Sequence, residues 1–169
     1  GLSAVEIGKA MGAKVIAAAS SDEKINICLK HGADEAFVYP SGTLDKEQQK
    51  ELSTRIKELT AGKGADVIYD PVGGSFSEPA LRSIAWEGRF LVIGFAAGEI
   101  PKLPLNLALL KGCQIVGVFW GAWTMMCQGE NEKNFEELYD LYSAGKINPE
   151  ISDRFSLEES AAAIAHLKD

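Results

Sequence analysis

The sequence has few of the residues that mark disulfide-bonded or metal-binding proteins. Its 169 residues include three cysteines, and Cys28, Cys113 and Cys127 fall into no CxxC motif or other paired spacing. A disulfide framework and a zinc cluster are therefore not expected, and a reducing cytoplasm fits this cysteine usage best. The two histidines, His31 and His166, look like helix-end or surface residues, because neither has a cysteine or histidine partner at ligand spacing.

Positive charge and long apolar runs are also scarce. Lys and Arg number 17 against 24 Asp and Glu, which gives a formal net charge of -7. Nucleic acids and anionic membranes recruit basic surfaces, so neither is expected as a partner. No apolar run approaches the length of a membrane span, and no signal peptide opens the chain. An anionic cofactor remains compatible with this charge, because helix N-termini and a few local cations can hold it.

What the sequence does contain is an alternation of short apolar segments with amphipathic ones. The apolar segments are typical of strands buried in a parallel sheet. Such alternation predicts an α/β fold of the Rossmann type, in which a doubly wound parallel sheet is covered by helices on both faces. Strands are predicted at 14–20, 35–39, 65–70, 89–94 and 113–120, and helices at 2–11, 20–31, 45–60, 76–84, 105–110 and 131–143.

Two local patterns carry more specific expectations. Ser20 stands three residues before Glu23, which is the spacing of a capping box, so Ser20 is predicted to cap the helix that follows. The tail at 151–169 is predicted to form a brief strand and then a helix starting near Ser156.

The first residues resemble the part of a dinucleotide fold that follows the phosphate-binding loop. In that fold the last glycine of the loop allows close packing of helix and strand, and the helix N-terminus binds the pyrophosphate. Gly1 is predicted to be this last glycine, and the alternative is that Gly1 is an arbitrary chain start. We expect the sequence to be truncated here, because no start methionine, first strand or earlier glycine precedes Gly1.

An ordered set of motifs spans nearly the whole chain, at residues 1–16, 20–24, 31–34, 69–74, 88–96, 117–121 and 145–149. In this order they resemble the coenzyme-binding domain of zinc-independent medium-chain dehydrogenases/reductases, in the quinone oxidoreductase (zeta-crystallin-like) branch. The resemblance implies an N-terminal catalytic domain and a further strand that this sequence lacks, so truncation is expected at both ends. It makes residues 1–150 an NADP-binding domain without its first strand and glycine loop. Residues 151–169 would return towards the catalytic domain.

The end of the strand at 14–20 predicts which nucleotide is bound. NAD-specific Rossmann domains usually place an acid there for the ribose 2′-hydroxyl, and an acid repels the 2′-phosphate of NADP. Here the position is Ala19, followed by Ser20 and Ser21, whose hydroxyls can donate hydrogen bonds to phosphate. Lys24 adds a positive charge, and Tyr39 is expected to close over the same phosphate. The resemblance implies these roles for Lys24 and Tyr39, and NADPH is therefore the expected cofactor.

Each of these residues also has an ordinary structural interpretation. Ser20 can be only a helix cap, Lys24 a solvated lysine and Tyr39 an edge aromatic. Asp22 and Glu23 would weaken the phosphate site only if their side chains face the phosphate.

The remaining strand ends predict the nicotinamide half of the site, because ligands of open α/β sheets bind beyond the carboxyl ends of the strands. Glycines there are alternatively turn residues and the aromatics alternatively core. The expected contacts are from Val72 and Gly73 to the ribose, from Ile93, Gly94 and Phe95 to the nicotinamide and, as the resemblance implies, from the backbone near Phe119 and Trp120 to the carboxamide.

The implied reaction is hydride transfer from NADPH to a quinone or an activated enone, in which the cofactor supplies the chemistry. No catalytic residue stands out in this chain. Tyr142 and Lys146 match the Tyr-x-x-x-Lys spacing of short-chain dehydrogenases, but Gly145 is expected to end the helix before Lys146, so we interpret the match as a coincidence.

Two further points concern partners and alternatives. The apolar strand at 113–120 is predicted to lie at a sheet edge, and we expect a homodimer in which this edge is paired. The alternatives are an enoyl or alkenal reductase or a zinc alcohol dehydrogenase of the same superfamily, and a non-catalytic nucleotide-binding module. A methyltransferase is disfavoured, because its cofactor strand usually ends in an acid rather than in Ala19, Ser20 and Ser21.

Overall fold

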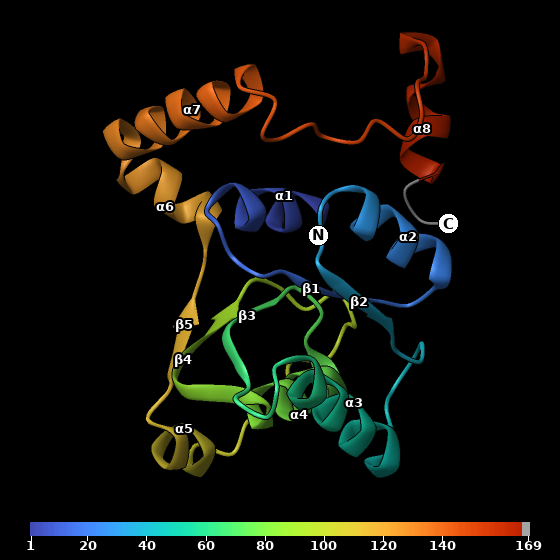
Figure 1. Cartoon of the computed structure of the whole chain (residues 1–169). Helices are drawn as coiled ribbons and strands as arrows, with labels where there is room; N and C mark the ends of the chain where they lie inside the picture. The colour runs from blue at the N-terminus through green and yellow to red at the C-terminus, as the bar shows by residue number, and fades with distance from the viewer. Residues whose placement is uncertain (167–169) are drawn as a thin grey trace.

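In residues 1–166, five parallel strands alternate with helices (Figure 1). The computed structural model describes residues 1–166, and the last three residues of the predicted tail lie outside the described residues. The strands are β1 (Ile16–Ala19), β2 (Glu35–Val38), β3 (Ala65–Asp70), β4 (Ile84–Val92) and β5 (Gln114–Gly117).

The strands form two parallel sheets among the described residues. One has β1 paired with β2, and the other has the order β3-β4-β5. The expected sheet is thus divided between β1 and β3. In the doubly wound order 3-2-1-4-5-6, the first strand of the fold lies at this position. The two sheets therefore correspond to strands 3-2 and 4-5-6 of that order.

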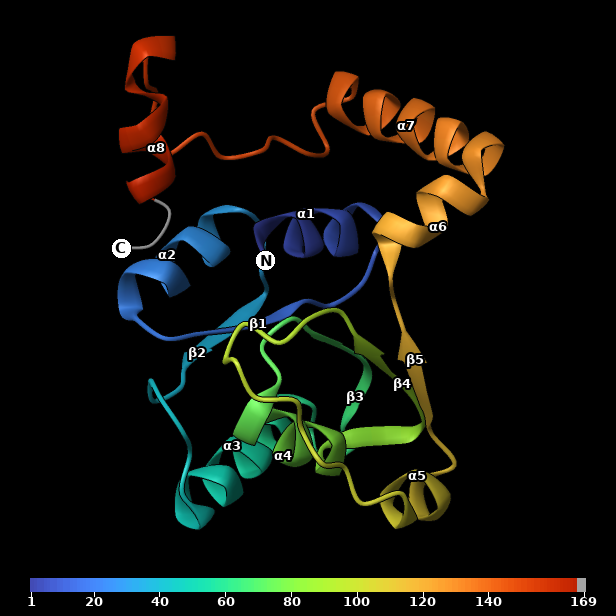
Figure 2. The same ribbon diagram turned by 180° about the vertical axis from the view of Figure 1, so that it is seen from behind.

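Helices cover the strands from two sides. Figures 1 and 2 show α1 and α2 on one side of the strands and α3 and α4 on the other. This arrangement confirms the predicted α/β fold of the Rossmann type. The helices are α1 (Leu2–Ala10), α2 (Asp22–Lys30), α3 (Lys46–Leu59), α4 (Ser77–Arg82), α5 (Asn106–Lys111), α6 (Trp120–Met126), α7 (Gln128–Ser143) and α8 (Ser160–His166), with 3-10 turns η1 (Gly74–Phe76) and η2 (Leu157–Glu159).

The predicted cap of α2 is wrong by one residue. Ser21, not Ser20, has the extended backbone of an N-cap, and its Oγ accepts a hydrogen bond from the Lys24 N–H at 3.3 Å. A capping oxygen needs to reach the first-turn N–H groups, and Ser21 is the residue directly before the helix. Ser20 is therefore free of the capping role.

One predicted strand end and one whole predicted strand are also wrong. β5 stops at Gly117, which pairs with Val92, the last residue of β4, so no partner strand continues beyond this pair. Trp120 consequently begins α6, a helix that the sequence pattern did not predict. Residues 151–156 form no strand, because no other described strand lies beside them to satisfy their backbone groups.

The start of β4 differs as well. β4 begins at Ile84 rather than at 89, so the helix α4 is shorter than expected. Ile84 pairs with Ala65, but the register then shifts so that Arg89 pairs with Val67. The extra residues of β4 are accommodated at Glu87, whose φ is 59°.

One apolar cluster joins the two sheets. Its buried members are Leu44, Leu52 and Phe76. Tyr39, which follows β2, and Val72, which follows β3, pack against them. The strand ends expected to hold the two halves of a dinucleotide therefore share one packed cluster.

The segment that follows α7 is tied to α1 and α2 by buried polar groups. His31 Nδ1 lies 2.8 Å from Glu6 Oε1, and His31 Nε2 lies 2.7 Å from Glu150 Oε2. The side chains of His31 and Glu6 are only 6% and 8% exposed. The Asn148 N–H also donates to Glu6 Oε1 at 3.0 Å. The hydrogen bonds with Glu6 and then Glu150 raise the pKa of His31.

His31 therefore differs from the predicted surface histidine, although it does cap the end of α2. His166 is exposed and lies 3.0 Å from Asp153 Oδ2, which agrees with the prediction. Among residues 1–166, no helix is long and apolar enough to span a membrane.

We expect His31→Gln to lower the free energy of unfolding by about 2 kcal/mol, because a buried carboxylate loses a charged partner. The loss should depend on pH. The folded pKa of His31 is raised, so its contribution is full below the unfolded value of about 6.5 and disappears as pH rises through the folded pKa. Denaturant unfolding of both proteins at a series of pH values measures this. His166→Gln is the matched control, and an equal pH dependence in both variants would contradict the assignment.

Candidate nucleotide-binding site

Because the strands are parallel, their carboxyl ends lie at one edge of the fold. Ser20 follows β1 there and Tyr39 follows β2. Residues 71–74 follow β3, and residues 93–97 follow β4. This edge is where ligands of open α/β sheets bind.

The phosphate half of the expected site is assembled around the end of β1. The Tyr39 N–H donates to the Ala19 carbonyl at 2.9 Å, which holds the residue after β2 beside the residue before Ser20. The Lys24 Nζ donates to Ser20 Oγ at 3.2 Å. The cap residue Ser21 is directly between Ser20 and the first turn of α2. The structure thus brings together Ser20, Ser21 and Lys24, with Tyr39 on the neighbouring strand end.

Tyr39 also connects this half to the rest of the edge. Its ring packs against Phe76 with the centroids 4.9 Å apart. Burial, and to a smaller extent the charge of Asp70, raise the pKa of Tyr39. The phenol is therefore neutral at physiological pH and can donate a hydrogen bond.

Gly1 is the residue directly before α1. Its carbonyl accepts a hydrogen bond from the Ala4 N–H at 3.0 Å, and the space around its Cα is open. The first N–H groups of α1 lack helical partners at this end. The position suits the predicted glycine beside a pyrophosphate, and its role stays a prediction.

The residues expected to form the nicotinamide half lie in two loops that hydrogen-bond along their length. The Ala96 N–H donates to the Pro71 carbonyl at 3.1 Å, and the Ala97 N–H donates to the Val72 carbonyl at 2.9 Å. The Gly74 N–H donates to the Glu99 carbonyl at 3.0 Å. The loop after β3 and the loop after β4 therefore form one unit.

This unit contains Val72, Gly73, Ile93, Gly94 and Phe95, the residues predicted from the sequence. Gly73 is buried with φ 72°, and a Cβ on Gly73 would lie 2.9 Å from the ring of Phe95. Phe95 packs over the Gly73 backbone while remaining 42% exposed. Its ring is consequently available to a ligand and is not ordinary core.

Phe119 and Trp120 lie beyond the end of β5. The Val118 N–H donates to the Val92 carbonyl at 3.0 Å, which keeps this end beside the end of β4. Phe119 is 79% exposed and Trp120 is also exposed, so neither is a core residue. The backbone of this turn therefore lies beside the start of the 93–97 loop.

Sequence reasoning did not single out Asp70 and Ser77. Asp70 is buried, and its Oδ1 accepts hydrogen bonds from the N–H groups of Val72 and Gly73 at 2.9 and 3.0 Å. Ser77 Oγ donates to Asp70 Oδ2 at 2.6 Å. An aspartate directly before Pro71 and a Gly-Gly pair is a signal for such a turn, because Asp side chains bind backbone N–H groups two residues on.

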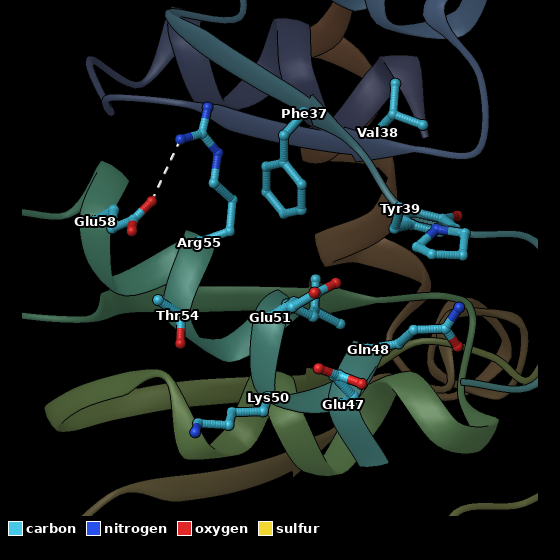
Figure 3. A pocket seen from close by; sticks show the side chains of 12 residues that line it. Phe37, Val38, Tyr39, Glu47, Gln48, Lys50, Glu51, Thr54, Arg55 and Glu58 are labelled. Atoms are coloured by element: carbon cyan, nitrogen blue, oxygen red, sulfur yellow. Dashed lines mark hydrogen bonds and ion pairs between the residues drawn. The ribbon is translucent and has the colours of Figure 1, made fainter. Parts of the chain in front are cut away.

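A separate groove of about 510 Å³ runs between β2 and α3 (Figure 3). Phe37 points into this groove, whereas Val38 points away from it (Figure 3). The α3 side of the groove carries an ion pair, in which Arg55 Nη1 lies 3.4 Å from Glu58 Oε2. The groove meets the candidate site only at Tyr39, which also lines it.

The described residues hold no group of three or more His, Cys, Asp or Glu side chains placed to bind a metal ion. The three cysteines are free. The helix α7 ends at Ser143, and Gly145 has φ 68°, so Lys146 is not on the helix that carries Tyr142. Tyr142 and Lys146 therefore do not lie one turn apart on a single helix, as the short-chain motif requires.

Comparison with known proteins identifies the family. The family model described as zinc-binding dehydrogenase matches residues 1–142. The chain belongs to this family. Quinone oxidoreductase-like protein 2 of Bos taurus is 34% identical over 168 residues, which cover 99% of the chain and 46% of that protein. An NAD-dependent alcohol dehydrogenase of Sulfolobus acidocaldarius is 31% identical, with 98% of the chain and 43% of that protein covered.

The fold also matches solved structures of quinone oxidoreductases. The crystal structure of Escherichia coli quinone oxidoreductase complexed with NADPH aligns with a TM-score of 0.74 and 25% identity, and the match covers 90% of the chain and 44% of that structure. These matches confirm the resemblance to the coenzyme-binding domain of quinone oxidoreductases. The chain spans less than half the length of the bovine relative.

We expect Gly73→Ala to lower the free energy of unfolding by about 2–4 kcal/mol, because a Cβ there meets both a positive φ and the ring of Phe95. Gly98→Ala is the matched control, since Gly98 has φ 83° with nothing within 4 Å of a Cβ. It should cost only about 1 kcal/mol from the backbone. Equal losses for the two variants in thermal or denaturant unfolding would show that Phe95 does not press on Gly73.

Proposed function

We propose that this chain binds NADPH and forms the cofactor-binding part of an oxidoreductase that transfers hydride from NADPH to a quinone or an activated enone. One observation carries the proposal. At the end of β1, where NAD-specific domains place an acid, the chain has Ala19 and then the hydrogen-bonded pair of Ser20 and Lys24. The match to an NADPH-bound quinone oxidoreductase supports the same cofactor.

The side chains at this end fit a phosphate. The Lys24 ammonium forms no ion pair with a carboxylate of residues 1–166, so its charge is available. Ser20 Oγ is within hydrogen-bond distance of Lys24, and the Ser21 hydroxyl lies at the N-terminus of α2. Hydroxyl donors, an ammonium group and a helix N-terminus are the groups that bind phosphate in proteins. In this proposal Lys24 and Ser20 hold the 2′-phosphate and Tyr39 lies over it.

The loops after β3 and β4 would receive the other half of the dinucleotide. In this proposal Val72 and Gly73 contact the ribose, and the exposed face of Phe95 shields one side from water. NADPH supplies a hydride when bound. The chain would orient the nicotinamide ring, and the reduced quinone can take its proton from solvent, so the proposal requires no acid from these residues.

We expect Lys24→Ala to weaken NADPH binding about 10- to 100-fold, because a charge-assisted hydrogen bond to phosphate is lost. NADH lacks the 2′-phosphate, and its affinity should change less than about twofold. Calorimetric titration with both nucleotides measures this. Lys57→Ala, an exposed lysine on α3, is the matched control with the same change in net charge. Tighter binding of NADH than NADPH by the unsubstituted chain would overturn the cofactor assignment.

The second candidate is a dehydrogenase or enoyl reductase that uses NADH. The match to an NAD-dependent alcohol dehydrogenase favours it. The absence of an acid at Ala19 weighs against it, because the ribose 2′-hydroxyl then lacks its usual acceptor. The alternative from another class is a non-catalytic nucleotide-binding module. It would bind a nucleotide, but the full protein that contains it would not oxidise or reduce any substrate.

We also propose a cytoplasmic homodimer paired through β5. The strand pairs with β4 on one side, and among the described residues no strand pairs with its other side. Phe119 and Trp120, just beyond its end, are exposed aromatics of the kind that gather at interfaces. The free cysteines support a reducing compartment.

We expect Val116→Lys on β5 to convert a dimer to a monomer, because a charge at a paired edge is costly to bury. Multi-angle light scattering reads the mass directly. Val38→Lys on β2 is the control, since Val38 is an exposed valine on the edge of the other sheet. A monomer before substitution, or a dimer that survives Val116→Lys, would contradict the proposed interface.

A further inference from the structure

Asp70 holds both loops of the nicotinamide half from a single position at the end of β3. Its side-chain Oδ1 accepts two hydrogen bonds from the loop after β3, from the N–H groups of Val72 and Gly73. Its backbone carbonyl accepts hydrogen bonds from the loop after β4, from Ile93 N–H at 3.0 Å and Gly94 N–H at 3.4 Å. Asp70 therefore bonds to both loops, in addition to the hydrogen bonds that join the loops to each other.

The carboxylate is enclosed, since Asp70 is 9% exposed. Its second oxygen accepts the Ser77 hydroxyl, and Ser77 is fully buried at the start of α4. No Lys, Arg or His of residues 1–166 forms an ion pair with Asp70. A buried carboxylate held only by N–H and O–H dipoles is costly to desolvate, and a neutral side chain could accept the same two N–H bonds. Acceptance of these two N–H bonds, rather than the charge itself, is therefore what holds the turn.

The effect of Asp70 reaches an exposed aromatic through one contact. The two N–H bonds hold Gly73 at φ 72° and ψ -151°. In that conformation the Gly73 backbone packs against the ring of Phe95. Without the carboxylate, the N–H groups of Val72 and Gly73 would lack these partners, and the turn that packs against Phe95 would be held less firmly.

We propose that Asp70 is a positioning residue for the nicotinamide half of the site: it fixes the loop at 71–74, and through Gly73 the ring of Phe95, in the arrangement that receives the nicotinamide and its ribose. The inference rests on the proposed binding of NADPH. Asp70 acts through the loop and does not itself contact the cofactor. Ser77 serves the same purpose by fixing the orientation of the carboxylate.

The test compares two ligands that share the adenosine half. NADPH fills both halves of the site, whereas adenosine 2′,5′-bisphosphate reaches only the phosphate half around Ser20 and Lys24. Asp70→Ala should weaken NADPH binding about tenfold and change the affinity for adenosine 2′,5′-bisphosphate less than about twofold, both measured by calorimetry. The change in nicotinamide fluorescence on binding should also be reduced in this variant.

Two further variants separate positioning from folding. Asp70→Asn keeps an oxygen that accepts the Val72 and Gly73 N–H groups, so NADPH affinity should return to within about threefold of the unsubstituted chain. Ser77→Ala retains the carboxylate and should give a smaller loss in the same direction. Retained affinity for adenosine 2′,5′-bisphosphate shows that each variant is folded.

The outcomes distinguish this inference from the proposed function. Equal loss of both ligands in Asp70→Ala, or no loss of NADPH, would overturn the positioning role while leaving NADPH binding in place. Failure of the unsubstituted chain to bind NADPH would overturn the proposed function and the positioning role with it.

Discussion

Parallel pairing of the strands is the constraint on which the candidate site depends. Strands that run in the same direction must release their following loops at the same edge. Ala19 and Val38 are the last paired residues of β1 and β2, and Val92 and Gly117 are the last of β4 and β5. The loops and first helical turns that follow the strands carry all the candidate binding residues except Gly1, although the residues are far apart in the sequence. A change of strand direction in either sheet would disperse them.

Two buried carboxylates are stabilised in different ways, and each organises a different region. Glu6 is paired with His31, so a titrating charge ties the segment around Glu150 to the first two helices. Asp70 is held by N–H and O–H dipoles, and it orders the loops at the ligand edge. The chain carries a net charge of -7, yet Lys24 remains unpaired with the carboxylates of the described residues. Local arrangement, rather than total charge, therefore decides where an anion can be held.

Much of the site could be predicted because strand ends are visible in the sequence. Short apolar segments followed by proline mark where β2 and β3 finish, and a doubly wound order then places the following residues at one edge. The choice between Ser20 and Ser21 as the cap could not be made in this way, because both can accept the same bond. The start of α6 at Trp120 could not be predicted either, because the apolar run of β5 continues through Trp120. β5 ends earlier only because its partner β4 ends at Val92.

The sequence by itself determined the fold class, the order of the five strands and the residue types at each strand end. These follow from periodicity and local turn chemistry, which act over a few neighbouring residues. Only the tertiary structure decided that His31 is enclosed between Glu6 and Glu150, and that Asp70 links the loops after β3 and β4. Such contacts join residues distant in sequence, and their partners depend on packing. The sequence predicted which groups belong to the candidate site, and the structure determined how they are held together.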